Sequence, residues 1–565
     1  MGNFLIQGLV AAGAASYVLQ KRAPHYSLGL WTTASALFFA YFFLVQLWRI
    51  IVYPRFFSPL RRLPHPPNGH WLWDQTGRIL KEPTGFPMRE WVDNIPNAGL
   101  IRYSTWFEQR VLVTNPKGLA EVLVTKNYDF EKPKQFSQSL GRFLGRGILF
   151  AEGDEHKRQR KNLMPAFAFR HIKNLYPTFW RKAREMAQVL SATIKEDSRR
   201  DGTTEEKKKA SGDAAAVEHA PGAIEVYDWN SRATLDIIGV SGMGRDFNSL
   251  HDPSNKLNQT YKSIFNPGRV GNLIRLVAIF IPIQLLRLLP LRRNTETSQA
   301  SSYIKQVCRD LITEKRARLE AQKQRSKTDI DILSVALESG GFSDEDLVNQ
   351  MMTFLIAGHE TTATAMTWAV YELCKHPSIQ QKLRDEVRSK LPPLDDDVTA
   401  AQIDDCPYLQ AFCNEVLRVW SPVPLTLRVA ARDTSIVGQF IPRGTPVILC
   451  PWAVNLSRQL WGPDAHEFKP ERWLDDDVVD GHTNNRGSAE SNYAFLTFLH
   501  GPRSCIGQKF AQAEFACLVA AWAARFETRF EEGGALAGGE EPRISTGITS
   551  RPKGGLWVQL KEAGE

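Results

Sequence analysis

The chain has 565 residues, of which 43% are hydrophobic and 23% are charged. These fractions are typical of a globular protein with a sizeable core, and they exclude collagen-like, wholly disordered and disulfide-rich classes. The 70 Lys and Arg residues exceed the 61 Asp and Glu residues and give a net charge of +9. Outside the run 157–161, no concentrated basic patch accompanies this excess, which argues against a nucleic-acid partner. The 7 cysteines are scattered without a CxxC pair, as expected in a reducing compartment.

Near the start of the chain, the segment 27–48 predicts a transmembrane anchor. Residues 27–47 carry no formal charge, over a length that can cross the roughly 30 Å hydrocarbon core as a helix. Trp31 and Trp48 lie near its ends, where aromatic side chains favour the membrane interface. Four arginines follow the segment: Arg49, Arg55, Arg61 and Arg62. By the positive-inside rule they place the rest of the chain in the cytosol, which suggests the endoplasmic reticulum membrane of a eukaryote.

The preceding segment, 1–26, is also apolar, but it is rich in Ala and Gly and is a weaker candidate for a second span. Lys21 and Arg22 would then lie in a short lumenal turn, against the positive-inside rule, so a single span is favoured. A cleaved signal peptide fits poorly, because the stronger apolar run comes second and is followed by arginines. With a cytosolic domain, the glycosylation sequons at Asn258 and Asn455 would not be used.

Beyond the anchor, the segment 49–70 predicts a basic, proline-rich hinge, and 71–565 predicts one folded domain. The stretch 197–222 is charged, rich in small residues and free of aromatic residues, which predicts a disordered insertion. The apolar stretch 271–292 contains arginines and two prolines and is too broken to span a membrane. It is either a core element or a segment that lies on the bilayer surface.

Helical patterns dominate beyond residue 300. The clearest helix begins after Ser343, a good N-cap that acidic residues follow, and ends near His376 before Pro377. Its middle is apolar on all sides, so it should run through the core. Short strand-like stretches with turn signals appear near 99–114 and 426–449. The predicted fold class is therefore mainly α with a smaller β part.

The segment 498–507 matches the pattern F-x-x-G-x-R-x-C-x-G at every fixed position. Cys505 stands just before a predicted helix, whose N-terminus lowers a thiol pKa and favours the thiolate. Gly501 and Gly507 allow the backbone to close around a large flat partner. Phe498 can shield the sulfur from water, and Arg503 can pair with an anion. A thiolate ligand to iron fits this arrangement.

In these residues the chain resembles the cytochrome P450 family of haem-thiolate monooxygenases, from about residue 64 to the C-terminus. The resemblance implies the cytochrome P450 fold with an N-terminal transmembrane helix, and a haem-thiolate catalytic domain over 71–565. It implies haem b as the cofactor and Cys505 as the axial ligand of the iron. Phe498, Gly501, Arg503 and Gly507 would then surround the cofactor.

The long helix contains the segment 357–362, in which two small residues precede His, Glu and two Thr. It resembles the oxygen-activation motif of the family. The resemblance implies that Thr361 orders water and protons beside the iron and that Glu360 is the relay acid. A helix kink from Ser/Thr back-bonding is the alternative reading of this segment alone.

Two further motifs of the family are present. Glu415 and Arg418 form the ExxR pair on one helical face, and the segment 468–473 places Arg472 in a PERF-type sequence. By resemblance these three side chains interlock behind the cysteine loop in a structural role.

Haem propionates require cations, and the resemblance offers four binding residues: His156, Arg160, Arg428 and Arg503. His156 stands where the family's W-x-x-x-R motif has Trp, and it can still donate a hydrogen bond to a carboxylate. The neighbouring basic residues are Lys157, Arg158 and Lys161. They form either a solvated face or a docking patch for an acidic electron donor. NADPH-cytochrome P450 reductase is the expected partner, and cytochrome b5 is an additional one.

The expected reaction is the insertion of one oxygen atom from O2 into a lipophilic small molecule in specialised metabolism of the terpenoid or polyketide type, in a fungus. The pocket regions would be 137–150, 350–362 and 423–427. Their readable residues are apolar or small: Phe354, Leu355, Ala357, Val423, Leu425 and Thr426. The alternatives are a haem-thiolate isomerase or dehydratase without a reductase, a fatty-acid or xenobiotic hydroxylase, and a non-enzymatic haem protein. Glu360 and Thr361 favour the monooxygenase over the reductase-free enzymes and the haem-binding protein.

Overall fold

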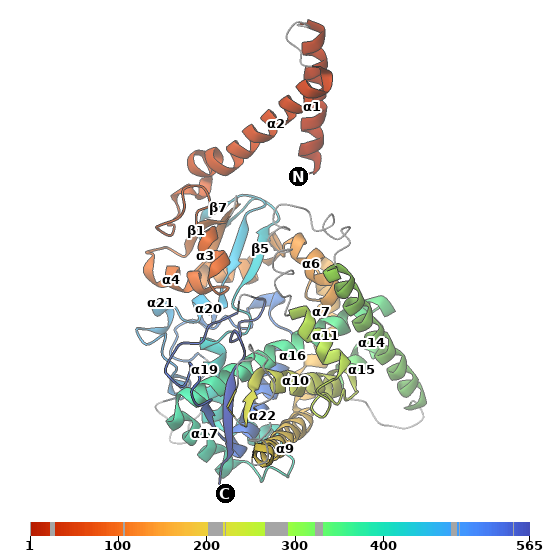
Figure 1. Ribbon diagram of the computed structural model, residues 1–565, viewed down its shortest axis with the longest axis vertical. Helices are drawn as coiled ribbons and strands as arrows, with labels where there is room; N and C mark the ends of the chain where they lie inside the picture. Colours follow the sequence, from red (N-terminus) through yellow and green to blue (C-terminus); the bar gives the residue numbers. More distant parts are fainter. Residues whose placement is uncertain are drawn as a thin grey trace, which may run out of the picture.

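The computed structural model describes residues 2–22, 29–105, 108–201, 219–220, 222–265, 292–322, 331–475, 483–484, 486–545 and 547–564. Helices form most of the body, and a small sheet lies between them and the N-terminal helices (Figure 1). The mainly α fold class with a smaller β part is therefore confirmed. The candidate insertion is described only at its edges, because helix α9 runs to Asp201 and 202–218 lie outside the described residues. The stretch 271–291 also lies outside them.

The helices of the first half are α1 (Gly2–Arg22), α2 (Leu30–Leu47), α3 (Thr76–Lys81), α4 (Phe86–Asn94), α5 (Pro116–Ala120), α6 (Lys134–Leu144), α7 (Gly153–Leu163), α8 (Phe169–Lys173), α9 (Tyr176–Asp201), α10 (Val226–Met243) and α11 (Lys256–Phe265). Those of the second half are α14 (Arg292–Gln322), α15 (Ile332–Glu338), α16 (Asp344–Lys375), α17 (Pro377–Lys390), α18 (Ala400–Asp404), α19 (Pro407–Val419), α20 (Pro451–Val454), α21 (Arg458–Trp461) and α22 (Gln508–Arg525). Two segments are π-helical, η2 (Trp48–Phe57) and η4 (Glu121–Thr125). The 3-10 segments are η3 (Pro59–Arg62), η5 (Asn127–Asp129), η6 (Met164–Phe167), η7 (Pro470–Trp473), η8 (Asn492–Ala494) and η9 (Gly501–Arg503).

The largest sheet has the strand order β1-β2-β8-β5-β3, and only β2 and β8 pair in parallel. Its strands are β1 (Leu100–Thr105), β2 (Glu108–Val113), β3 (Phe130–Glu131), β5 (Thr426–Ala430) and β8 (Pro446–Leu449). A second sheet has the order β4-β10-β9, formed by β4 (Ala223–Glu225), β9 (Phe526–Phe530) and β10 (Trp557–Glu562). The hairpin of β6 (Thr434–Ile436) and β7 (Gln439–Ile441) completes the sheets of the described chain. The strand-like stretches expected near 99–114 and 426–449 are thus present.

Helix α16 begins where the sequence predicts. Ser343 is its N-cap, and Ser343 and Asp346 form a reciprocal capping box that satisfies two backbone amides. His376 is the C-cap, and Pro377 starts the next helix. The middle of α16 is buried, as its apolar sequence requires, except at Ala357, Gly358 and Thr361, which line a cavity.

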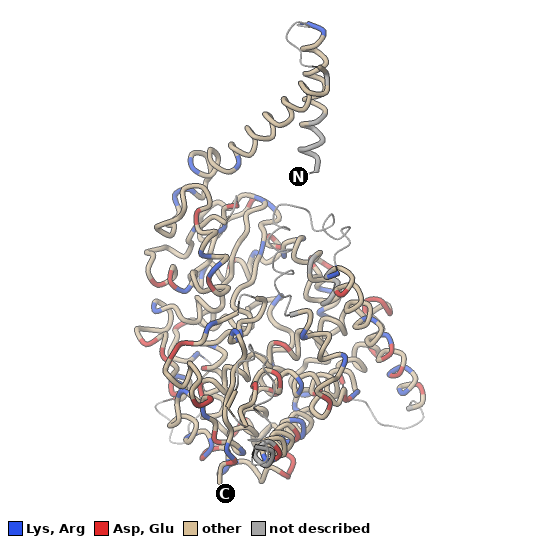
Figure 2. Tube along the Cα trace, in the orientation of Figure 1, with Lys and Arg blue, Asp and Glu red and all other residues tan. Residues whose placement is uncertain are grey.

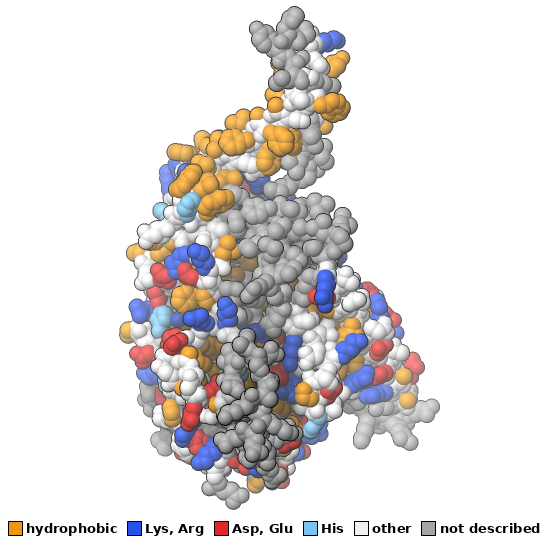
Figure 3. Space-filling model, viewed as in Figure 1, with side chains coloured by type: hydrophobic (Ala, Val, Ile, Leu, Met, Phe, Trp, Pro, Cys, Tyr) orange, Lys and Arg blue, Asp and Glu red, His pale blue; other side chains and the backbone are white. Residues whose placement is uncertain are grey.

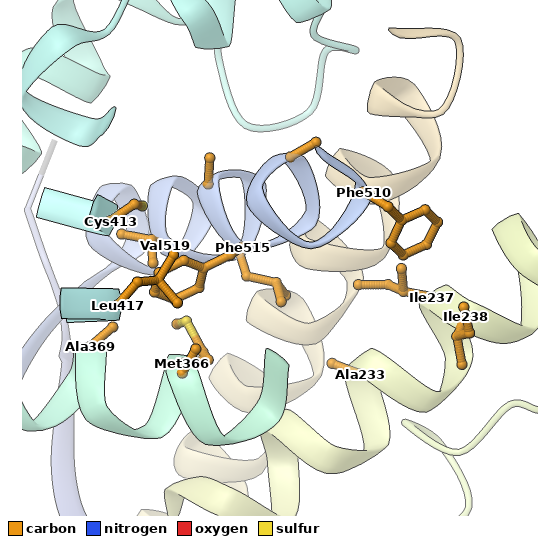
Figure 4. Close-up of a cluster of buried hydrophobic side chains, with 14 of the residues drawn as sticks. Ala233, Ile237, Ile238, Met366, Ala369, Cys413, Leu417, Phe510, Phe515 and Val519 are labelled. Atoms are coloured by element: carbon orange, nitrogen blue, oxygen red, sulfur yellow. The ribbon is translucent and has the colours of Figure 1, made fainter. Parts of the chain in front are cut away.

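The core lies where α16, α10, α19 and α22 meet (Figure 4). Phe515 of α22 lies near Leu417 of α19 and Met366 of α16, whereas Phe510 points toward Ile237 of α10. The packing of α22 against α16 fixes the end of α22 that follows the cysteine loop.

The N-terminal helices extend away from the body (Figure 1). Helix α2 continues without a break into η2, so 31–57 form one apolar helix long enough to cross a membrane, and α2 confirms the apolar helix expected over 27–48. The helical path continues to Phe57 through Pro54, so the first part of the hinge expected over 49–70 is helical. The wider turns of a π-helix accommodate Pro54, which would remove one hydrogen bond from an α-helix.

Candidate functional site

A cavity of about 340 Å³ lies between α16, the cysteine loop and the start of α22. Its walls are mostly apolar, and Cys505, Thr361 and a group of basic side chains also line it. Among the expected pocket residues, Phe354, Ala357, Val423 and Thr426 line the cavity. Leu355 and Leu425 do not belong to its lining, and Leu355 is fully buried among other core residues.

The cysteine loop is folded back on itself. The Cys505 amide donates a hydrogen bond to the Phe498 carbonyl over 2.9 Å, which closes the loop immediately before α22. Gly501 adopts a φ of +74°, and a Cβ there would lie 2.3 Å from the Leu123 carbonyl oxygen. Only glycine fits this position. Gly507 has an ordinary φ of −88°, and its open side faces the cavity.

The thiol of Cys505 is free and has exposed surface toward the cavity. Burial in the protein raises the pKa of this thiol above its ordinary value, while the Gly507 amide and the Arg160 guanidinium oppose the rise. Both opposing groups favour the thiolate, which is the form that binds metals. The residue is therefore accessible from the cavity and flanked by groups that stabilise an anion.

Five basic side chains line one side of the cavity: Lys132, His156, Arg160, Arg428 and Arg503. Arg160 donates to the Ser504 carbonyl over 2.8 Å, and Arg428 donates to the Leu427 carbonyl over 2.8 Å. Arg503 donates to the Phe130 carbonyl over 2.7 Å and pairs with Glu152. The Nε atom of Arg503 and the Nδ1 atom of His156 are buried without a hydrogen-bond partner.

The electrostatics of this basic group are unfavourable without an anion. Burial and the charge of Arg428 lower the pKa of Lys132 to about 7. Burial and the charge of Lys132 lower the pKa of His156 to about 4. Burial and Arg503 lower the pKa of Arg428 to about 10. Glu152 is the carboxylate paired within this basic group. A ligand with two further negative charges would offset the remaining positive charge and accept hydrogen bonds from the donors that lack a partner. The two propionates of a haem supply such charges.

The side chain of Thr361 faces the cavity, whereas that of Glu360 faces away from it. The Thr361 hydroxyl lies in the cavity wall and donates to the Ala357 carbonyl over 2.8 Å. Glu360 is 2% exposed, and its side chain lies outside the cavity lining. Gly358 lets α16 approach α10 closely, because a Cβ there would lie 3.0 Å from Ile238.

The carboxylate of Glu360 joins three distant segments. It accepts hydrogen bonds from the Tyr227 hydroxyl at the start of α10 and, over 2.9 Å, from the Thr549 hydroxyl near the C-terminus. The Arg551 guanidinium lies 3.8 Å away and stacks over the Tyr227 ring. In this conformation, Glu360 is bound to neighbours that the sequence motif does not contain.

The ExxR pair lies away from the cavity and is fully buried. Arg418 Nε lies 2.8 Å from the Glu415 carboxylate, and Arg472 Nε lies 3.0 Å from the same carboxylate. Trp473 also donates to Glu415 over 2.9 Å. Although burial alone would raise the pKa of Glu415, the charge of Arg418 lowers it below its ordinary value. This geometry matches the expected interlocking of the three side chains.

Two charged residues of the cavity, Lys132 and Glu514, are absent from the site residues expected from the sequence. Lys132 precedes Pro133 in a segment with no recognisable motif, and it joins the basic group only through the fold. Glu514 lies on α22, where its Oε2 atom accepts a hydrogen bond from Thr362 over 3.1 Å. Its Oε1 atom is buried without a partner, and burial raises its pKa well above the ordinary value. Its position on α22, nine residues after Cys505, is the one signal in the sequence that pointed to it.

A family model described as cytochrome P450 matches residues 100–555, so the chain belongs to the cytochrome P450 family of haem-thiolate enzymes, in which a cysteine binds the haem iron. It is a cytochrome P450 monooxygenase, an oxidoreductase. It is 44% identical to cytochrome P450 monooxygenase sphH of Aspergillus fumigatus, over 91% of this chain and 90% of that protein. It is 42% identical to FUM15 of Gibberella moniliformis, over 91% and 90% of the two chains. It is also 42% identical to ALT8 of Alternaria alternata, over 91% and 92%.

Proposed function

We propose that the Cys505 thiolate would hold the iron of haem b and that the protein inserts one oxygen atom from O2 into a lipophilic small molecule of fungal specialised metabolism. The observation that carries this proposal is the exposure of the Cys505 thiol to a mostly apolar cavity whose lining also includes five basic side chains. The apolar lining residues fit a substrate with little polarity. The fungal relatives, all named monooxygenases, agree with the reaction class.

In this proposal the residues around the cavity have separate roles. His156, Arg160, Arg428 and Arg503 bind the propionates, and Lys132 adds a fifth donor. Phe498 shields the thiolate from water, and Gly501 and Gly507 shape the loop around the macrocycle. When bound, haem b supplies the iron at which dioxygen is activated. One oxygen atom enters the substrate and the other leaves as water, which consumes two electrons and two protons.

Proton supply is the second part of the proposal. The Thr361 hydroxyl lines the cavity and can hold a water molecule or pass a proton at its Oγ1 atom. Glu360 is the acid that replenishes this proton. Its carboxylate must first leave the hydrogen bonds of Tyr227 and Thr549, because it faces away from the cavity. Tyr227 and Thr549 therefore position the relay acid.

The electrons come from an NADPH-dependent cytochrome P450 reductase, with cytochrome b5 as an additional donor, at the endoplasmic reticulum membrane. The supporting feature is the basic run on α7. Lys157 and Arg158 are each paired with an acid of the same helix, over 2.8 Å and 2.7 Å, while Lys161 is exposed. These pairs are solvent-exposed and weak, so an acidic partner can compete for both basic groups.

The first test is the difference spectrum of membranes that contain the protein, reduced with dithionite and exposed to carbon monoxide. A strongly red-shifted Soret band is expected for the wild type and for Cys517→Ala, a matched change on α22, and it should be lost in Cys505→Ala. Bound haem whose band is the same in all three proteins would refute thiolate ligation by Cys505.

Turnover in the presence of ¹⁸O₂ distinguishes the reaction classes. The monooxygenase proposal expects NADPH consumption that requires the reductase and one heavy oxygen atom in the product. Product without a label and without NADPH consumption would favour the isomerase or dehydratase. The same reaction screened with fatty acids, polyketides and terpenoids identifies the substrate class.

A further inference from the structure

Helix α1 packs along α2, away from the rest of the molecule (Figure 1). Among the α1 residues whose burial is described, 8 and 10–22, the buried ones are Gly8, Ala12 and Ser16, which are spaced by four and therefore share one face of the helix. A Cβ at Gly8 would lie 2.7 Å from the Tyr41 ring, so a larger residue there would displace this ring from its present contact with α1. Ala12 is 5% exposed and Ser16 is fully buried. Small residues at such a seam are typical of helices that pack within membranes.

Between residues 10 and 19, the outward face of α1 is apolar. Val10, Tyr17, Val18 and Leu19 are all about half exposed or more. Lysine and arginine lie only at the end of α1, and no acidic residue lies in its first turn (Figure 2). A helix that lies on a bilayer surface needs a charged or strongly polar face toward water, which α1 lacks. The outward face therefore requires an apolar environment.

The neighbouring helix has the same character. α2 exposes Trp31, Phe39, Phe43 and Leu44 and forms, together with η2, the candidate membrane span of the described chain (Figure 3). The 21 residues of α1 give a helix of roughly 32 Å, which matches the roughly 30 Å hydrocarbon core. Because α1 packs lengthwise on α2, it must share the surroundings of α2.

We infer that α1 is a second membrane span, that lipid acyl chains cover its outward face, and that α1 and α2 together form a helical-hairpin anchor. The inference rests on the membrane location proposed above. It replaces the single span that the sequence favoured. The start of α1 then lies on the same side of the membrane as the catalytic domain, and Lys21 and Arg22 lie on the opposite side. The four arginines that follow α2 outnumber this pair and keep the domain in the cytosol.

The topology is tested with N-glycosylation cassettes on flexible spacers in the full chain, placed before Met1, within 23–28, or after Glu565. The hairpin expects glycosylation only of the cassette within 23–28. Glycosylation before Met1 would overturn the hairpin. Glycosylation after Glu565 would overturn the cytosolic domain itself, so the two failures are distinguishable.

The packing is tested with Gly8→Leu and the matched control Gly13→Leu in the chain that carries the cassette before Met1. Both changes add the same apolar side chain to α1, but only Gly8 faces α2, and a Cβ at Gly13 meets no atom within 4 Å. A glycosylated fraction that rises several-fold in Gly8→Leu and stays low in Gly13→Leu is expected. Equal fractions would refute the role of the helix contact.

A photoreactive side chain in place of Val18 identifies the molecule that covers the outward face. Adducts with lipid are expected, because Val18 is 50% exposed on that face. Adducts with a second copy of the chain as the main product would overturn the lipid-covered face.

Discussion

At the scale of single residues, glycine occupies two positions of the cysteine loop for different physical reasons. Gly501 needs a left-handed backbone and has no room for a Cβ beside the Leu123 carbonyl. Gly507 has an ordinary backbone, and the nearest atom to an added Cβ would be the Phe167 ring at 3.8 Å. The first glycine is required by the fold, and the second borders the space of the cofactor.

We therefore expect Gly501→Ala to lower the free energy of unfolding by at least about 1–2 kcal/mol, because it adds left-handed strain and a clash with backbone. Gly507→Ala should retain the stability of the polypeptide but reduce the haem bound per chain. Urea unfolding and the pyridine haemochrome assay measure the two quantities. Equal loss of stability in both variants would contradict this assignment.

Glu514 is a buried acid whose side chain faces the cavity and the Thr362 hydroxyl. Its raised pKa means that the folded protein holds this proton more tightly than the unfolded chain does. Above about pH 4.5, the ordinary pKa of a glutamate, the unfolded chain loses this proton more readily than the folded protein does. The free energy of unfolding therefore falls as the pH rises.

Glu514→Gln removes this cost, because glutamine stays neutral and its carbonyl can still accept from Thr362. The stability of the wild type relative to Glu514→Gln should therefore fall as the pH increases from about 4.5 to about 8. Urea unfolding of both proteins across this range measures it. A constant difference between them would show that Glu514 ionises normally.

At the scale of elements, the Glu415 carboxylate joins α19 to η7. It pairs with Arg418 and Arg472 in a fully buried cluster, and its pKa is lowered relative to the ordinary value. The stabilising contribution of this acid is therefore present above its unfolded pKa and is lost as the pH falls through the folded value. Removing one partner of a buried ion pair leaves an uncompensated charge.

Glu415→Gln should cost about 3–5 kcal/mol of unfolding free energy at neutral pH, because both guanidinium groups lose their counter-ion. The matched control is Glu471→Gln, since Glu471 on η7 is paired with Lys382 at the surface over 2.9 Å. That change should cost under about 1 kcal/mol. Similar costs for the two variants would refute the structural role of the buried cluster.

At the scale of the whole molecule, the apolar helix over 31–57 attaches a largely polar body to the membrane. The fold of the body also bears on the two glycosylation sequons. Asn258 and Asn455 are fully buried, and the Asn455 amide donates to the Arg418 carbonyl over 3.1 Å. Neither side chain is accessible to a glycan in the folded protein.

Deleting residues 1–22 should leave the protein in the membrane pellet after alkaline carbonate extraction, because α2 and η2 remain. Deleting residues 1–57 should move it to the supernatant, because the apolar helix is lost. The fraction in each phase is measured by immunoblot. Release of the chain that lacks only 1–22 would show that α2 alone does not hold the protein in the bilayer.

Much of the fold was predictable where local pattern suffices. The capping signal at Ser343 and the proline at 377 bound α16, and an uncharged apolar run identified α2, because helix ends and membrane spans depend on neighbouring residues. The cysteine loop was also readable, since its glycine, arginine and cysteine are needed at fixed spacing along one short segment. These features identified the family and the candidate ligand.

The tertiary structure decided the features that depend on distant partners. Glu360 is bound by Tyr227 and Thr549, which lie 133 and 189 residues away, so no local pattern could show that its carboxylate turns from the cavity. Lys132 enters the basic group only because β3 pairs with β5 beside Arg428. The small size of Gly8 matters only because the Tyr41 ring of another helix packs against it. The sequence by itself determined the chemistry of the cysteine loop and the ends of α16, because these depend on adjacent residues. The fold decided which groups meet, because only packing brings distant segments together and sets the burial and charge that their side chains share.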